Sequence, residues 1–172
     1  MPYTLFATAF GTCGISWNGS GLTGFQLPDD TVERTEERMA ARAGDRAGEP
    51  PEWVRGIIGR VRLHLEGAPQ DFAGTALDAS RVGEFQMAVY RLTSAVKPGF
   101  KTSYGEIARL MGFGPESARA VGAALASNPW PLIVPCHRVV SADDRMNGFS
   151  APGGIRTKTR LLALEGAELL SE

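Results

Sequence analysis

Apolar and β-branched residues dominate three short runs at the start of the chain, and further on apolar residues recur at helical spacing. The runs cover residues 3–10, 11–17 and 22–27, and their composition is typical of strands. Asn18-Gly19 lies between the last two runs, and this dipeptide favours the tight turn of a β-hairpin. The N-terminus is therefore predicted to form a small antiparallel sheet.

Two segments with very different helical patterns follow the predicted sheet. Residues 31–47 are mostly Arg, Glu and Ala without a good apolar stripe, which predicts an exposed helix or a mobile connection. From Trp53 onward one helical face collects five apolar side chains, Val54, Ile57, Ile58, Val61 and Leu65. Pro51 suits the first turn of this helix and Gly67 suits its end. The second helix is expected to pack on the sheet.

A connection between two halves is predicted at residues 67–80, which contain Gly, Pro and Asp. We place the boundary near Ala79, with domains at 1–79 and 80–172. The next helical face consists of Phe85, Ala88, Val89, Leu92, Ala95 and Val96. The predicted fold is an α/β N-terminal domain, made of a small antiparallel sheet plus a helix, followed by a mostly α-helical, winged-helix-like domain.

The second half carries the outline of a helix-turn-helix. Ser103 and Glu106 have capping-box spacing, and this helix is expected to end at Gly112. Pro115 then opens a second helix, whose apolar face is predicted to comprise Ala118, Val121, Gly122 and Leu125. Such an outline is weak evidence for DNA binding, because many helical pairs bind nothing. Arg119 lies in the first turns, where this motif presents side chains to a DNA groove, although it could equally be an ordinary surface arginine.

Composition and charge narrow the choice of protein class. The 172 residues include two cysteines and 43% hydrophobic residues, which suits a globular protein without a disulfide framework. No apolar run is long enough to span a membrane, and we expect a cytoplasmic protein. The net charge is −1, but residues 97–160 hold nine basic and four acidic side chains. This local excess of positive charge is suited to contacts with a small number of DNA phosphates.

A cysteine next to a histidine is the strongest chemical signal in the chain. Residues 132–134 form an apolar run typical of a buried strand, and Pro135 ends that strand. Cys136 and His137 are therefore expected where a core strand stops, with the thiol partly exposed. A partner that lowers the pKa of the thiol would make it a nucleophile. The alternative is an inert buried cysteine.

Four segments together resemble the methylated-DNA-protein-cysteine methyltransferases, the O6-alkylguanine-DNA alkyltransferases. The resemblance is close over about residues 80–167, and the N-terminal half shares only the hairpin-then-helix outline. The segments are Arg119-Ala120-Val121-Gly122, Asn128-Pro129, Pro135-Cys136-His137-Arg138-Val139 and Leu161-Leu162-Ala163-Leu164-Glu165-Gly166. The cysteine motif is highly specific, and the other three segments occur in the same order and at similar spacing.

The resemblance implies direct-reversal DNA repair without a cofactor. The family's cysteine attacks the alkyl carbon on O6 of guanine and keeps the alkyl group permanently. Cys136 matches this acceptor, His137 the base that acts on it through a water molecule, and Glu165 the carboxylate that orients the imidazole. The implied activity is that of a single-turnover methylated-DNA-[protein]-cysteine S-methyltransferase on O6-alkylguanine, and O4-alkylthymine is a further possible substrate.

The resemblance also implies how the DNA is held, with the damaged base flipped out of the duplex. Arg119 matches the finger that fills the gap in the stack, Tyr104 the tyrosine beside the flipped nucleotide, and Asn128 a hinge that braces the recognition helix. The expected DNA-contacting set is Ser103, Tyr104, Ala118, Arg119 and Ala120. The expected substrate pocket comprises Pro135, Val139, Phe149 and Ser150, with the Val139 carbonyl reading the guanine edge. Asn128 could instead be only a helix C-terminal asparagine.

The chain also departs from the family in several places, and one of them is Ala126, which stands where some members carry a basic residue. Residues 143–154 do not map singly onto better-known members, so Phe149 and Ser150 are guesses at a pocket aromatic and a backbone donor. Cys13 and His64 are too few to form the four-ligand zinc site of some members, and no metal is expected.

Three other classes compete with the repair protein. A damage-binding alkyltransferase-like protein would carry another residue, often tryptophan, in place of Cys136. A cysteine-histidine hydrolase is disfavoured because neighbours on an extended chain point to opposite faces. A transcriptional regulator would need an additional module. We therefore expect a stand-alone monomer that binds double-stranded DNA containing O6-alkylguanine and has no membrane partner.

Overall fold

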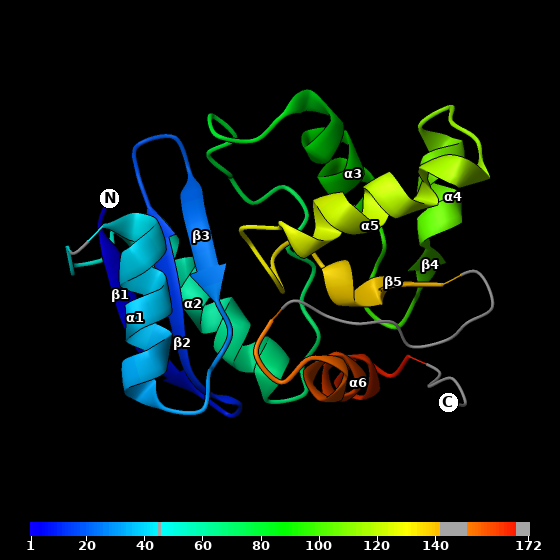
Figure 1. Cartoon of the computed structure of the whole chain (residues 1–172). Coiled ribbons are helices and arrows are strands. Elements are labelled where there is room, and N and C mark those ends of the chain that lie inside the picture. The colour runs from blue at the N-terminus through cyan, green and yellow to red at the C-terminus, as the bar shows by residue number, and fades with distance from the viewer. Residues whose placement is uncertain (45, 142–150, 168–172) are drawn as a thin grey trace.

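A three-stranded antiparallel sheet forms one side of the molecule and a group of helices forms the other (Figure 1). The computed structural model describes residues 1–44, 46–141 and 151–167. The strands are β1 (Tyr3–Thr8), β2 (Gly11–Trp17) and β3 (Leu22–Gln26), in the order β1-β2-β3. Asn18 closes the predicted hairpin turn, because its Oδ1 accepts hydrogen bonds from the backbone N–H groups of Ser20 and Gly21. The predicted N-terminal sheet is confirmed.

Helix α2 (Glu52–Leu65) covers one face of the sheet with the apolar side chains that the sequence predicted. Val54, Ile57, Ile58, Val61 and Leu65 are all buried. They share a core with the residues of β2 that point to the same face, Cys13, Ile15 and Trp17. The alternation of side chains along a strand therefore assigns this face of the sheet to α2.

Helix α1 (Val32–Ala43) covers the opposite face (Figure 1). Of the two predicted alternatives, the exposed helix is confirmed and the mobile connection is wrong, because most of the side chains of α1 are exposed. The prediction missed only that the helix packs on the sheet. It buries Thr35, Met39 and Ala43. Met39 lies over Gly14, where an added Cβ would come within 2.7 Å of the Met39 sulfur. Because the sheet offers a glycine here, Met39 can pack directly on the backbone of β2, in a small cluster with Tyr3 and Ala43. An apolar stripe is not needed, which explains why the sequence pattern missed this packing.

The connection between the halves runs along the free edge of β3. Leu22 donates its N–H to the Ala76 carbonyl at 2.9 Å, and its carbonyl accepts from Asp78 N–H at 2.8 Å. Gly21 has a φ of 153°, and a Cβ there would lie 2.6 Å from the Ala76 backbone. Only glycine permits this close approach. The segment predicted as a linker is thus bonded to the sheet.

The second half is mostly helical, as predicted. Its elements are α3 (Glu84–Ser94), β4 (Thr102–Ser103), α4 (Tyr104–Leu110), the 3₁₀ turn η1 (Pro115–Ser117), α5 (Ala118–Ala126), the 3₁₀ turn η2 (Cys136–Arg138), β5 (Val139–Val140) and α6 (Ile155–Leu164). The short strands β4 and β5 pair in parallel. Helices α4 and α5 pack together and form the predicted helix-turn-helix.

One hydrophobic core runs through both halves, from Phe6 in β1 to Leu161 in α6. Trp130 helps to join them, because its buried indole N–H donates to the Leu22 carbonyl at 2.9 Å. The boundary at residues 79 and 80 remains a prediction. Among the described helices, none has the length and apolar character that crossing a membrane requires.

Candidate active site

The chain leading to Cys136 is a tight turn, so the strand predicted at residues 132–134 was wrong. Leu132 has a φ of 77°, in the left-handed region that costs a non-glycine residue about 1–2 kcal/mol. The turn is closed by the Val134 N–H, which donates to the Trp130 carbonyl at 2.8 Å. All three apolar side chains are buried. The sequence pattern therefore indicated burial correctly and misjudged the backbone.

Asn128 and Pro135 hold this turn against the end of α5. The Asn128 amide donates to the Val134 carbonyl at 3.0 Å, and its Oδ1 accepts from the Trp130 N–H at 2.9 Å. Pro135, at φ −79° and ψ 64°, is the centre of an inverse γ-turn in which Cys136 N–H donates to the Val134 carbonyl at 2.7 Å. A proline ring fixes φ close to this value. Both residues set where Cys136 begins η2.

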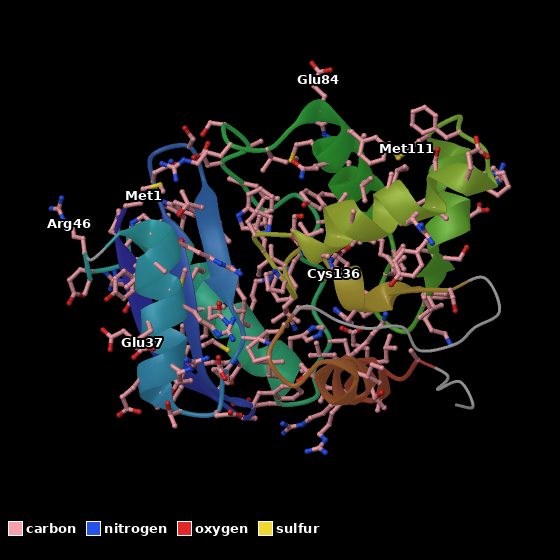
Figure 2. All side chains as sticks on the ribbon, in the orientation of Figure 1. Met1, Glu37, Arg46, Glu84, Met111 and Cys136 are labelled. Atoms are coloured by element: carbon pink, nitrogen blue, oxygen red, sulfur yellow. The ribbon has the colours of Figure 1, made fainter. Side chains whose placement is uncertain are left out.

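Cys136 is a buried thiol, so of the two alternatives left open by the sequence, partial exposure is wrong and burial is confirmed. Only 5% of the residue is accessible, and Figure 2 labels it near the middle of the molecule. Burial raises the pKa of Cys136 to about 11, although the Asn128 amide and the positive charge of Lys158 oppose this effect. At neutral pH the resting group is therefore a thiol, which needs a base at the moment of reaction.

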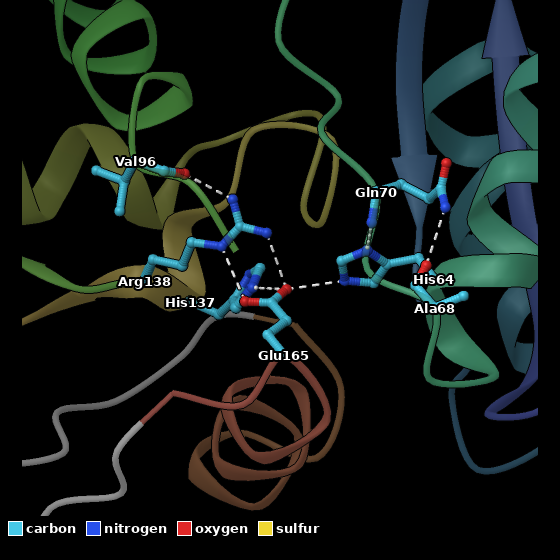
Figure 3. A network of polar contacts seen from close by, with 7 residues as sticks. All are labelled: His64, Ala68, Gln70, Val96, His137, Arg138 and Glu165. Carbon is cyan, nitrogen blue, oxygen red and sulfur yellow. Dashed lines mark hydrogen bonds and ion pairs between the residues drawn. The ribbon is translucent and has the colours of Figure 1, made fainter. Parts of the chain in front are cut away.

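His137, the residue after Cys136, forms a hydrogen-bonded pair with Glu165 (Figure 3). His137 Nε2 lies 2.8 Å from Glu165 Oε2, and both side chains are fully buried. Because a carboxylate only accepts, Nε2 carries the hydrogen and Nδ1 is left as an acceptor. In the described part of the chain, this buried Nδ1 has no hydrogen-bond partner. Burial lowers the pKa of His137 despite the adjacent carboxylate, so the imidazole is neutral and able to accept a proton.

Arg138 completes a set of four hydrogen bonds on the Glu165 carboxylate, a role that sequence reasoning missed. Arg138 Nε donates to Glu165 Oε1 at 2.9 Å, and Arg138 Nη2 donates to Glu165 Oε2 at 2.9 Å. Burial alone would raise the pKa of Glu165, but the bonds from His137, His64 and Arg138 outweigh it and hold that pKa far below its usual range. Glu165 is thus a fixed anion, and only 6% of the residue is exposed.

Lys158 is a second basic residue that the sequence did not single out. Its buried ammonium donates to the Val139 carbonyl at 2.7 Å and lies 6.0 Å from the centre of the Tyr104 ring. Burial lowers the pKa of Lys158 to about 8, and its charge in turn favours the Cys136 thiolate. The carbonyl expected to read the guanine edge is therefore already bonded by Lys158. The Lys158 ammonium thus interacts with Tyr104, with the Val139 carbonyl and with the Cys136 thiol.

The expected DNA-contacting residues lie on α4 and α5. Ser103 caps α4, because its Oγ accepts from the Glu106 N–H at 3.0 Å, while the Glu106 carboxylate pairs with Arg109. On α5, Arg119 and Ala120 are exposed and Ala118 is half-buried. Arg119 is the second residue of the helix, where a recognition helix presents side chains. Phe149 and Ser150 lie outside the described residues.

A metal centre has no support in the described ranges, where no group of three or more His, Cys, Asp and Glu side chains could hold an ion. His64 bonds to Glu165 and Cys13 is buried in the sheet. The site thus combines a buried thiol, a neutral imidazole, a fixed carboxylate and an exposed helix-turn-helix. These features define a class of DNA-binding protein that carries a cysteine nucleophile activated by histidine.

Comparison with known proteins identifies the family within that class. Residues 84–167 match the family model described as 6-O-methylguanine DNA methyltransferase, DNA binding domain. A methylated-DNA–protein-cysteine methyltransferase of Mycolicibacterium paratuberculosis is 37% identical over 96% of this chain and 92% of its own. One from Methanothermobacter thermautotrophicus is 31% identical over 91% of this chain and 80% of its own. The chain belongs to the methylated-DNA–protein-cysteine methyltransferase family.

Solved structures agree with this assignment. Mycobacterium tuberculosis OGT in complex with DNA matches with a TM-score of 0.77 and 30% identity, over 96% of this chain and 93% of the other. The O6-methylguanine-DNA methyltransferase of Pyrococcus kodakaraensis matches with a TM-score of 0.74 and 25% identity, over 96% and 99%. The sequence-based fold class and family resemblance are confirmed.

Proposed function

We propose that this protein repairs O6-alkylguanine in double-stranded DNA by transferring the alkyl group irreversibly to Sγ of Cys136. The observation that carries the proposal is the neutral His137, the residue after Cys136, whose Nε2–H is fixed on Glu165 and whose bare Nδ1 is buried without a hydrogen-bond partner among the described residues. This is the arrangement of a nucleophile with a base and an orienting carboxylate. The proposed subcellular location of the protein is the cytoplasm.

The reaction is a displacement at the alkyl carbon. The thiol proton passes to His137 Nδ1 through a bridging water, a new S–C bond forms, and the C–O6 bond of the base breaks. The guanine anion then takes up the proton, so the proton lost by the thiol ends on the dealkylated guanine, which stays in the DNA strand. Glu165 stabilises the transient imidazolium and Lys158 the thiolate, and no cofactor takes part.

Roles on the DNA side follow from exposure and position. Arg119 is proposed to fill the space left by the flipped nucleotide, with Ser103, Ala118 and Ala120 along the same surface. Tyr104 is proposed to lie beside the flipped base. Asn128 is proposed to brace α5 against the turn before Cys136, a role supported by its two hydrogen bonds there.

Repair is expected to stop at one alkyl group per chain, because the other cysteine, Cys13, is buried in β2 and cannot regenerate the acceptor. Intact mass before and after incubation with an O6-methylguanine duplex should show a gain of one methyl group. Peptide mapping should place it on Cys136. Sustained multiple turnover, or a methyl group on another residue, would contradict the proposal.

Arg119→Ala is expected to slow repair of a duplex substrate while leaving transfer from free O6-benzylguanine nearly unchanged. The reason is that extrusion of a stacked base from the duplex costs a few kcal/mol, whereas a free base needs no extrusion. Arg34→Ala on α1, also exposed, is the matched control and should behave as wild type. Both substrates should be assayed under single-turnover conditions.

Two other outcomes would argue against the finger role of Arg119. A weaker affinity for all DNA, with a salt slope reduced by about one unit, would make it a phosphate contact. Equal losses on duplex and free base would indicate damage to the fold.

A further inference from the structure

His64 is a buried imidazole from the N-terminal half that reaches the carboxylate next to the acceptor thiol. It lies in the last turn of α2 and is fully buried. Its Nε2 is 2.8 Å from Glu165 Oε2, across 101 positions of sequence. The same carboxylate oxygen is bonded by His137 at 2.8 Å. Figure 3 shows the carboxylate between the two rings.

The loop after α2 fixes which nitrogen of His64 carries the hydrogen. The Gln70 N–H donates to His64 Nδ1 at 2.9 Å, so Nδ1 is an acceptor and the hydrogen lies on Nε2. The Gln70 side chain is itself anchored on the Ala68 carbonyl at 3.0 Å, and the Phe72 ring packs 5.5 Å from the imidazole centre. His64 is therefore a neutral donor aimed at Glu165.

We propose that His64 is a positioning residue for alkyl transfer, which acts by donating a second imidazole hydrogen bond to the carboxylate that orients His137. This inference rests on the proposed function. With Arg138 holding the carboxylate from one side and His64 from another, Oε2 stays in line with His137 Nε2. The bare Nδ1 is then held in one orientation, and the N-terminal half contributes directly to the reaction centre.

The same contact limits how strongly Glu165 attracts a proton on His137. The charged and titratable groups that act on His137 are Glu165 at the C-terminal end of α6, Arg138 from η2 and His64 from α2, while Lys158 from α6 acts on the neighbouring Cys136. An oxygen that already accepts from His64 and Arg138 is a weaker acceptor for His137. Loss of the His64 donor should therefore raise the pKa of His137.

The direction of the pH effect follows from the role of the base. His137 must be neutral to take the thiol proton, so the transfer rate falls when acid protonates it. A higher pKa of His137 moves that fall toward neutral pH. Misplaced packing alone would lower the rate equally at every pH, so the position of the acid limb separates the two explanations.

The test compares single-turnover transfer from an O6-methylguanine duplex by wild type, His64→Phe and His64→Gln between about pH 5 and pH 8. Phenylalanine fills the space beside Phe72 but cannot donate, whereas the glutamine amide can reach Glu165. His64→Phe should lose about tenfold in plateau rate, part of the value of a charge-assisted hydrogen bond, and its acid limb should shift upward. His64→Gln should recover the wild-type acid limb and most of the rate.

A wild-type rate and profile in His64→Phe would overturn the proposal. The proposal would also be overturned if both variants lost transfer rate to the same extent and the acid limb of the pH profile did not shift. His64 would then have only a packing role. If thermal melting shows that His64→Phe is unfolded, His64→Asn replaces it, because the shorter amide cannot reach Glu165. Failure of the wild-type protein to accept a methyl group would instead refute the proposed function, so the two failures are distinguishable.

Discussion

Cys136→Ser is expected to abolish alkyl transfer while the protein still binds duplex DNA. A serine hydroxyl is far less acidic than a thiol and less nucleophilic toward an alkyl carbon. The buried position makes this worse, since burial already raises the pKa of the thiol to about 11. Loss of a catalytic nucleophile typically reduces rates by on the order of 10⁶-fold, so transfer should fall to background. The DNA-binding surface on α4 and α5 is not altered by this change.

The second cysteine supplies the matched control for this prediction. Cys13 is also fully buried, and burial raises its pKa to about 12, but it lies in β2 against α2. Cys13→Ala should therefore accept one methyl group per chain, as the wild-type protein does. Mass spectrometry of the reacted proteins, with gel-shift affinity on the same samples, checks both variants. An inactive Cys13→Ala beside an active Cys136→Ser would reverse the site assignment.

Glu165→Gln is expected to slow alkyl transfer and to destabilise the fold at once. An amide cannot accept the four hydrogen bonds that now converge from His137, His64 and Arg138. His137 loses the charge that stabilises its imidazolium, and the comparable Asp→Asn change in a serine-protease triad costs roughly 10⁴-fold. Arg138 is left as a buried cation without its partner, which typically costs about 3–5 kcal/mol. Urea unfolding and single-turnover transfer measure the two effects separately.

The loss of stability caused by Glu165→Gln should become smaller as the pH falls. The pKa of Glu165 is held far below its usual range in the folded protein. The contribution of the Glu165 carboxylate to the free energy of unfolding is therefore fully present above the ordinary glutamate pKa of about 4.3. It is lost progressively as the pH falls below that value. The urea midpoints of wild type and Glu165→Gln should converge in acid. Glu37→Gln on the exposed face of α1 is the control, and equal midpoints at neutral pH for all three proteins would contradict the prediction.

Local sequence determined the elements whose signals lie within a few residues. The hairpin needs only the turn that Asn18 closes, and α2 needs only apolar residues at helical spacing. The helix-turn-helix follows from a cap at Ser103 and a break near Gly112, which has a φ of 85°. These features depend on backbone geometry and short-range hydrogen bonds, so a single sequence predicts them.

Sequence also identified Cys136, His137 and Glu165 as candidates, through a short motif and a resemblance. It could not predict that the thiol is buried behind a tight turn, because an apolar run at residues 132–134 indicates burial without specifying a strand. The left-handed Leu132 lies in a turn that is closed by hydrogen bonds of Val134 with Asn128 and Trp130. Such a conformation is stable only within the packed protein.

Tertiary structure alone decided how the reaction centre is held. α1 packs on the sheet because a glycine makes room for Met39, and no helical pattern records a space on another element. His64 and Arg138 converge on Glu165 from α2 and η2, and the spacing of 101 residues between His64 and Glu165 carries no local signal. Their meeting follows from burial, since a carboxylate removed from water must gather donors from whichever elements the fold brings near it.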